Sequence, residues 1–131
     1  MERVRKELPM KFTIPVEPRT KKNSQQIIIV NGRPMIIPSK QFKEFEKDAL
    51  WFLPKEQIDY GVNVKALFYM KTKRRVDLTN LLEALDDCLV KGGTLVDDNS
   101  NIIVGHDGSR VLYDKENPRI EVEIEQIKPM D

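Results

Sequence analysis

Residues 74–102, RRVDLTNLLEALDDCLVKGGTLVDDNSNI, contain a helical pattern that begins after paired arginines and ends before paired aspartates. Aspartate is a favoured residue at the start of a helix and glycine is favoured just past its end, so a helix is predicted from near Asp77 to Gly92-Gly93. A short extended segment would then lead to Asp97-Asp98. The apolar face of this helix consists of leucines at helical spacing: Leu78, Leu81, Leu82, Leu85 and Leu89.

The charges around this helix are segregated, although the net charge of the chain is only +1. Seven acidic residues lie between Asp77 and Asp107, against one lysine, Lys91. Basic residues gather near the N-terminus and again in residues 71–75. Basic segments suit phosphates, and an acidic centre beside them suits cations. The alternative is that these charges only form a solvated surface.

Before this stretch, the sequence predicts a strand, a hairpin and a helix. Residues 11–16 read as a strand at a sheet edge, because Pro15 interrupts it. Two β-branched runs, residues 26–30 and 35–37, flank Asn31-Gly32, which is the preferred pair for a tight hairpin turn. A helix is expected from an N-cap at Ser39 to about Leu53. Its buried stripe is formed by Phe42, Phe45, Ala49 and Phe52.

The remaining patterns predict strands. Residues 62–71 read as a central strand, residues 102–104 and 109–112 as short strands, and residues 119–127 as a strand with one buried face. The predicted fold class is therefore α+β: one domain over residues 1–131, with a mixed β-sheet covered by two helices and an early β-hairpin. Trp51 lies off the helix stripe and is expected to pack either on a partner subunit or on another core surface.

The bulk composition narrows the class of protein. The chain has 131 residues and a single cysteine, Cys88, which excludes an intramolecular disulfide and cysteine-rich zinc sites. No apolar run approaches the length of a membrane span, and the N-terminus lacks the apolar segment of a secretory signal. A cytoplasmic protein with a reduced core thiol is expected.

The spacing of the acidic residues resembles the core pattern of the RusA family of Holliday-junction resolvases, roughly D-x-D-N-L-x-K, then a helix, a glycine-containing turn and D-D. Here the pattern stands as Asp77, Asn80 and Asp97-Asp98 around Gly92-Gly93. The resemblance implies a homodimeric endonuclease that depends on magnesium, with manganese as a possible substitute for that metal. Such an enzyme nicks four-way junction DNA symmetrically in recombination and repair. The catalytic residues that the resemblance implies are Asp77 and Asp98, with Asp97 as a further metal ligand and Asn80 in support. Glu83 joins the predicted catalytic and metal-binding residues through a hypothesis about two departures from the pattern.

Two positions depart from the family pattern. Thr79 stands in place of its second aspartate, and Glu83 stands in place of its lysine. Positions 79 and 83 share a helix face, so our hypothesis is that the pair has been exchanged as a unit, which keeps the number of carboxylates and loses the lysine charge. Two alternatives remain open: a junction-binding protein with weak or no nuclease activity, and an adaptor domain that does not bind nucleic acid.

The basic residues provide the expected contacts to DNA phosphates. The candidate phosphate-binding residues are Arg19, Lys21, Lys22, Lys73, Arg74 and Arg75. The alternative for residues 73–75 is a solubilising strand end. His106, the single histidine, lies between glycines and could act as a base, but a lone loop histidine is more typical of a hydrogen-bonding role, so it is left outside the predicted site.

Overall fold

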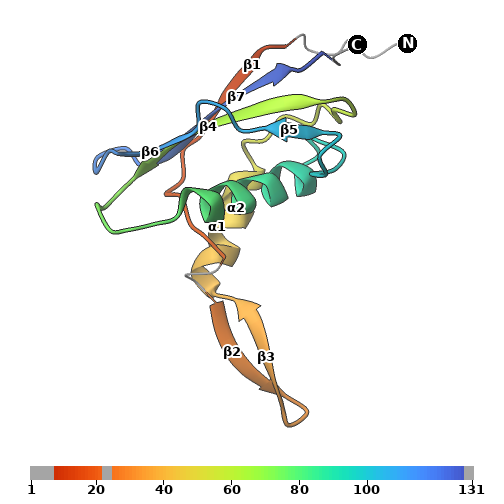
Figure 1. Ribbon diagram of the computed structural model, residues 1–131. Coiled ribbons are helices and arrows are strands. Elements are labelled where there is room, and N and C mark those ends of the chain that lie inside the picture. The colour runs from red at the N-terminus through yellow and green to blue at the C-terminus, as the bar shows by residue number, and fades with distance from the viewer. Residues whose placement is uncertain (1–7, 22–24, 129–131) are drawn as a thin grey trace.

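The central strand of the protein, β4 (Val62–Met70), organises its main sheet. The computed structural model describes residues 8–21 and 25–128. Strand β7 (Arg119–Gln126) pairs antiparallel with β4, and β1 (Met10–Ile14) pairs antiparallel with β7 at the sheet edge (Figure 1). The predicted edge position of the first strand is therefore confirmed, and the strand ends just before Pro15.

The other side of β4 is shared by two short parallel strands. Strand β5 (Ile103–Gly105) pairs with the beginning of β4, and β6 (Arg110–Tyr113) pairs with its end. The sheet is therefore mixed, as predicted. The loop between β5 and β6, which contains His106, therefore runs alongside the middle of β4.

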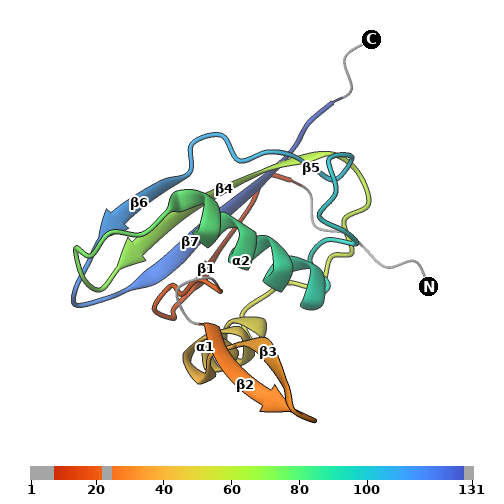
Figure 2. The same ribbon diagram turned by 60° about the horizontal axis from the view of Figure 1, so that its bottom comes forward.

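Helices α1 (Lys40–Leu50) and α2 (Leu78–Lys91) lie on one side of this sheet (Figures 1 and 2). The Oγ of Ser39 accepts the N–H of Phe42 at 3.2 Å, so the predicted N-cap of α1 is confirmed. The core lies between the helices and the sheet, where apolar side chains lose their contact with water. Its largest fully buried side chains include Ile14, Phe42, Phe68, Leu81, Leu85, Leu89, Ile120 and Ile124.

The end of α1 differs from its prediction. The helix stops at Leu50, so Phe52 leaves the apolar stripe and is 46% exposed. Trp51 is 82% exposed, which shows that the alternative of packing on another core surface is wrong. Contact of Trp51 with a partner subunit stays a prediction. No helix in the described ranges is long and apolar enough to cross a membrane.

The early hairpin is confirmed but stands apart from the main sheet. Strands β2 (Gln25–Val30) and β3 (Arg33–Pro38) pair only with each other in the sheet topology. Positive φ angles of 52° at Asn31 and 76° at Gly32 are those of the type I′ turn predicted from this pair. The hairpin projects away from the body of the protein (Figure 1).

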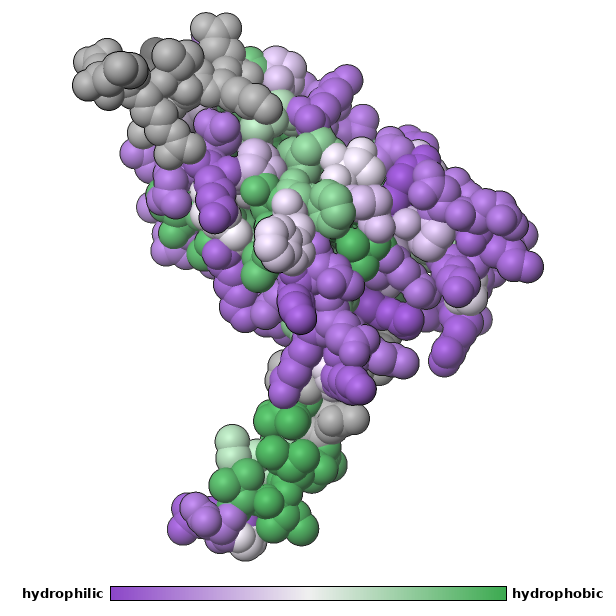
Figure 3. All heavy atoms as spheres, turned by 180° about the vertical axis from the view of Figure 1, so that it is seen from behind, coloured by the Kyte–Doolittle hydropathy of each residue, from purple (hydrophilic) through white to green (hydrophobic). Residues whose placement is uncertain are grey.

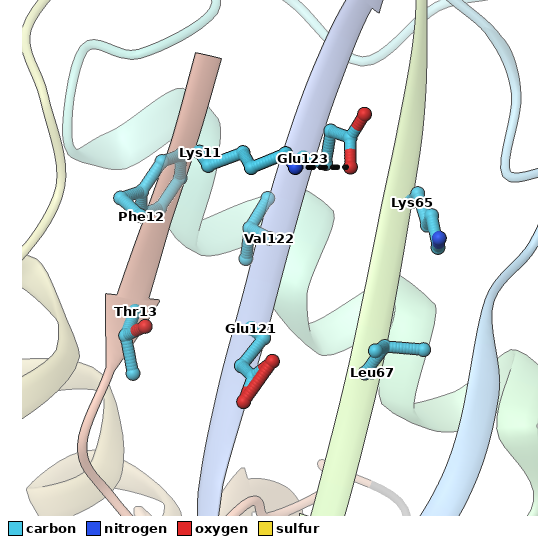
Figure 4. Close-up of a pocket in the computed structure, with 8 residues that line it drawn as sticks. All are labelled: Lys11, Phe12, Thr13, Lys65, Leu67, Glu121, Val122 and Glu123. Carbon is cyan, nitrogen blue, oxygen red and sulfur yellow. Dashed lines mark ion pairs between the residues drawn. The ribbon is translucent and has the colours of Figure 1, made fainter. Parts of the chain in front are cut away.

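The sheet face turned away from α2 carries balanced charge (Figure 4). Lys11 forms an ion pair with Glu123 at 3.8 Å. Lys65 lies on β4 and Glu121 lies on β7, the strand of Glu123. A pocket of about 400 Å³ opens among these side chains. Because its lysines are matched by glutamates, this pocket offers neither a concentrated positive site for phosphate nor an acidic site for a cation.

Candidate functional site

Asp77 occupies the N-cap position of α2, but its side chain does not cap the helix. Its backbone is extended, with φ −86° and ψ 126°, and its carbonyl oxygen accepts the N–H of Leu81 at 3.2 Å. Its carboxylate makes no cap hydrogen bond and instead accepts the side-chain amide of Asn80 at 3.3 Å. The carboxylate is therefore held by Asn80 at the start of the helix, and this geometry suits the supporting role predicted for Asn80.

The loop after α2 places Asp97 and Asp98 differently. Asp97 accepts the backbone N–H of Asp98 at 2.7 Å and the side-chain amide of Asn99 at 3.1 Å. The hydrogen bond from the Asp98 backbone is the main cause that lowers the pKa of Asp97 below its ordinary value. Both oxygens of Asp97 thus stabilise a turn.

Asp98 instead lines a pocket of about 270 Å³ against α2. The predicted site residues Glu83 and Asp98 line this pocket together, although they lie fifteen positions apart in the sequence. Asp77 and Asp97 are not among its lining residues. We call this surface the acidic pocket, and it is lined by Thr79, Leu82, Glu83, Asp86, Asp98 and His106.

The sequence did not identify Asp86 and His106 as members of this pocket. The Nε2 of His106 lies 2.9 Å from Oδ2 of Asp86. This hydrogen bond raises the pKa of His106, while burial is the main cause that raises the pKa of Asp86. One signal could have identified Asp86: it lies three residues after Glu83 and seven after Thr79, so the three share a helix face. The prediction that His106 takes part in hydrogen bonding is therefore confirmed.

His106 lies in the loop between β5 and β6, which hydrogen bonds hold against the middle of β4. The side-chain amide of Asn63, on β4, donates to the carbonyl of Asp107 at 3.1 Å and accepts the N–H of Asp107 at 2.8 Å. Ser109 Oγ accepts the N–H of Ala66 at 3.0 Å. These bonds fasten both sides of the turn to β4. Gly108 has φ +87°, a conformation that glycine adopts without strain.

A second pocket, of about 510 Å³, lies at the N-terminal end of α2 and is basic. The loop after β1 contributes Arg19, and the segment between β4 and α2 contributes Lys71, Arg74 and Arg75. Arg74 and Arg75 are exposed, and Arg19 donates to Glu17 at 3.1 Å. We call this surface the basic pocket. The structure thus brings together three of the predicted phosphate-binding residues from two distant segments.

The other predicted basic residues lie outside this pocket. Lys73 places its ammonium 5.1 Å from the ring centroid of Tyr113. Lys21 forms an ion pair with Asp87 of α2, and that hydrogen bond is the main cause that raises the pKa of Lys21. Lys22 lies outside the described residues. Their contacts to DNA stay predictions.

The side chains of the acidic pocket are of the type that binds a hard cation, but they are not arranged around one point. Carboxylate oxygens are the ligands that Mg²⁺ prefers, and the charge of Asp98 contributes to the raised pKa of Asp86, which indicates that the two carboxylates repel. Within residues 8–21 and 25–128, no three His, Cys, Asp or Glu side chains converge into a ready metal site. The donor atoms are thus of the kind that magnesium prefers, but among the described residues they do not converge on one point.

Most of the chain matches one known protein family. The family model of endodeoxyribonuclease RusA matches residues 15–125. This range contains the hairpin, both helices, the acidic pocket and the basic pocket. A search of curated proteins gives no match to the chain.

Proposed function

Because the chain belongs to the RusA endodeoxyribonuclease family, we propose that it resolves Holliday junctions as a magnesium-dependent homodimer. It would nick two strands of a four-way junction symmetrically, since a two-fold dimer presents two identical sites to two equivalent strands. The observation that carries the proposal is the acidic pocket itself. Asp98, which matches the family pattern, and Glu83, which our exchange hypothesis adds, line one surface pocket. A basic pocket lies at the N-terminal end of the same helix.

The metal would be held by carboxylates around α2. Asp98 and Glu83 are the principal ligands in this proposal. Asp77, which lies at the start of the helix and does not line the pocket, would join them only if its carboxylate moved toward the pocket when the metal binds. Asp97 is the weakest of the four, because both of its oxygens already accept hydrogen bonds within its turn. When bound, Mg²⁺ would supply positive charge against the phosphodiester and acidify water for attack on phosphorus.

The basic pocket would hold the DNA backbone. Arg19, Arg74 and Arg75 line it and present guanidinium groups, which match phosphate geometry with paired hydrogen bonds. Contacts of this kind supply affinity and orientation but no sequence information. The two pockets thus divide the work: one positions the strand, and the other holds the groups that support hydrolysis.

The departures from the family pattern fall within the acidic pocket. Thr79 and Glu83 both line it, which supports our proposal that threonine and glutamate were exchanged as a unit for aspartate and lysine. Glu83 would then supply the carboxylate that Thr79 lacks. The lost lysine charge is not replaced by either residue, and among residues 8–21 and 25–128 His106 is the one basic side chain that lines the pocket.

The central experiment compares cutting and binding of a synthetic four-way junction by the parent protein and Asp98→Asn. With Mg²⁺, the variant should cut more slowly by on the order of 100-fold. Without Mg²⁺, both should shift the junction equally in a gel. Asp48→Asn is the matched control, since Asp48 is exposed on α1, and it should cut like the parent.

Two results would contradict the proposal. A parent protein that binds junctions and never cuts them would support the junction-binding alternative. Absence of any salt-sensitive DNA binding would support the adaptor alternative.

A further inference from the structure

The β2–β3 hairpin exposes more apolar surface than its size can sustain alone. Ile27, Ile29 and Ile36 are 73%, 77% and 66% exposed. Apolar atoms cover most of the projecting hairpin, in contrast to the largely polar body seen from the same side (Figure 3). Soluble monomers rarely present a contiguous patch of this kind, and a two-stranded hairpin alone is only marginally stable in water.

The strand register places the barest side chains on one face. Ile27 pairs with Ile36, and Ile29 pairs with Pro34, so these four residues face the same way. The opposite face carries Ile28 and Met35, which are also paired and are 37% and 48% exposed. The patch of Ile27, Ile29, Pro34 and Ile36 therefore has no polar side chain, whereas Arg33 lies on the opposite face.

The chemistry of the hairpin favours a protein partner over DNA. Arg33 is the one charged residue among residues 25–38. An arm that binds the phosphate backbone needs several lysines or arginines, and here those residues lie in the basic pocket instead. A surface with a depleted charge and an apolar centre is typical of the core of a protein interface.

The prolines favour a closed pair of identical chains, and the apolar area suits a weak pair. Ile27, Ile29 and Ile36 together expose roughly 400 Å² per copy, so packing two such faces together would bury roughly 800 Å², which is the size of weak, concentration-dependent interfaces. Pro34 and Pro38 lack the N–H groups that another strand would need along β3. Open-ended strand addition is therefore blocked at that edge, which favours a closed dimer over a fibre.

We propose that two copies of this chain associate through their β2–β3 hairpins, with the face of Ile27, Ile29 and Ile36 packed against the same face of the second copy. This inference rests on the homodimer of the proposed function and names its interface. A two-fold axis through the hairpins makes the patch self-complementary, because each copy offers the same isoleucines.

The first test measures mass in solution by analytical ultracentrifugation. At high protein concentration the parent should sediment as a dimer. The double variant I27K/I29K should sediment as a monomer with an unchanged far-ultraviolet circular dichroism spectrum, because the hairpin projects from the body. Val104→Lys is the matched control, since Val104 is 54% exposed on β5, and it should stay dimeric. A monomeric parent, or a dimeric double variant, would overturn the interface.

The second test uses engineered cysteines, so the hairpin does not have to fold with lysines on its apolar face. Burial raises the pKa of the native Cys88 thiol to about 12, so it should not react under mild oxidation. Ile27→Cys, Ile29→Cys and Ile36→Cys should include at least one variant that forms a disulfide-linked dimer. Val104→Cys should form none. Failure of all three hairpin variants to cross-link would count against the face-to-face arrangement.

Junction assays separate this inference from the proposed function. A dimeric parent whose hairpin variants become monomeric, but which never cuts a junction, would retain the interface and lose the nuclease. A double variant that stays dimeric and loses junction binding would identify the hairpin as a DNA-binding arm and would overturn the interface.

Discussion

Helix α2 is flanked by two pockets that differ in charge and in the segments that build them. The acidic pocket joins Glu83 of the helix to Asp98 of the loop that follows. The basic pocket joins Arg19 to Arg74 and Arg75, which precede the helix. One helix thus separates two kinds of charge: arginines and a lysine gather before its start, while carboxylates lie along its side and in the loop beyond it.

The largest expected effect tests the acidic pocket through the exchanged pair. Glu83→Gln should reduce magnesium-dependent cutting on the order of 100-fold, because it removes a proposed ligand while keeping the shape of the side chain. Adding Thr79→Asp to that variant should restore much of the cutting, since the carboxylate returns to the same helix face. Cutting rates and Mn²⁺ affinity by calorimetry would be measured for all three proteins.

This experiment has a clear failure. If Glu83→Gln cuts and binds Mn²⁺ like the parent, the exchange hypothesis is wrong. Glu44→Gln serves as the control, since Glu44 is exposed on α1.

The next effect tests the basic pocket. R74A/R75A should weaken junction binding and lower the dependence of log affinity on log salt by about 2, since each lost phosphate contact removes about one unit of slope. Cutting at saturating protein should change far less than binding does. Binding would be measured by fluorescence anisotropy over a series of salt concentrations. Lys115→Ala, at an exposed site between β6 and β7, provides the control. An unchanged salt slope would remove these arginines from the DNA-binding surface.

The elements of the fold were predictable because their signals are local. Helix α2 follows from its leucine spacing, and the hairpin follows from Asn31-Gly32 between β-branched runs. The pairing of Asp86 with His106 was not predictable in the same way. It depends on how the loop after β5 is fastened to β4 by Asn63, which is a contact between segments more than forty residues apart. Local patterns decide the elements, whereas the site depends on tertiary contacts.

A smaller effect concerns the stability of the Asp86–His106 pair. The pKa of His106 is raised above 6.5 in the folded protein, so its stabilisation is fully present below that value and is lost as the pH rises through the raised pKa. His106→Asn should lower the free energy of unfolding by about 1 kcal/mol near pH 6, and by less near pH 9. Chemical denaturation at both pH values, without metal, measures this. A difference that grows with pH would contradict the assignment.

The smallest effect concerns Lys21 and Asp87, where a basic residue of the early loop meets the acidic side of α2. Both side chains are partly exposed, so solvent screens their ion pair and limits it to about 0.5 kcal/mol. The pKa of Lys21 is raised above 10.5, so this contribution should persist to that pH and fade as the pH rises further. A double-mutant cycle with Lys21→Met and Asp87→Asn would isolate the coupling by denaturation. A coupling near zero would mean that the ion pair adds nothing to the free energy of unfolding, so that no stability would be lost if Lys21 left Asp87 to contact a DNA phosphate.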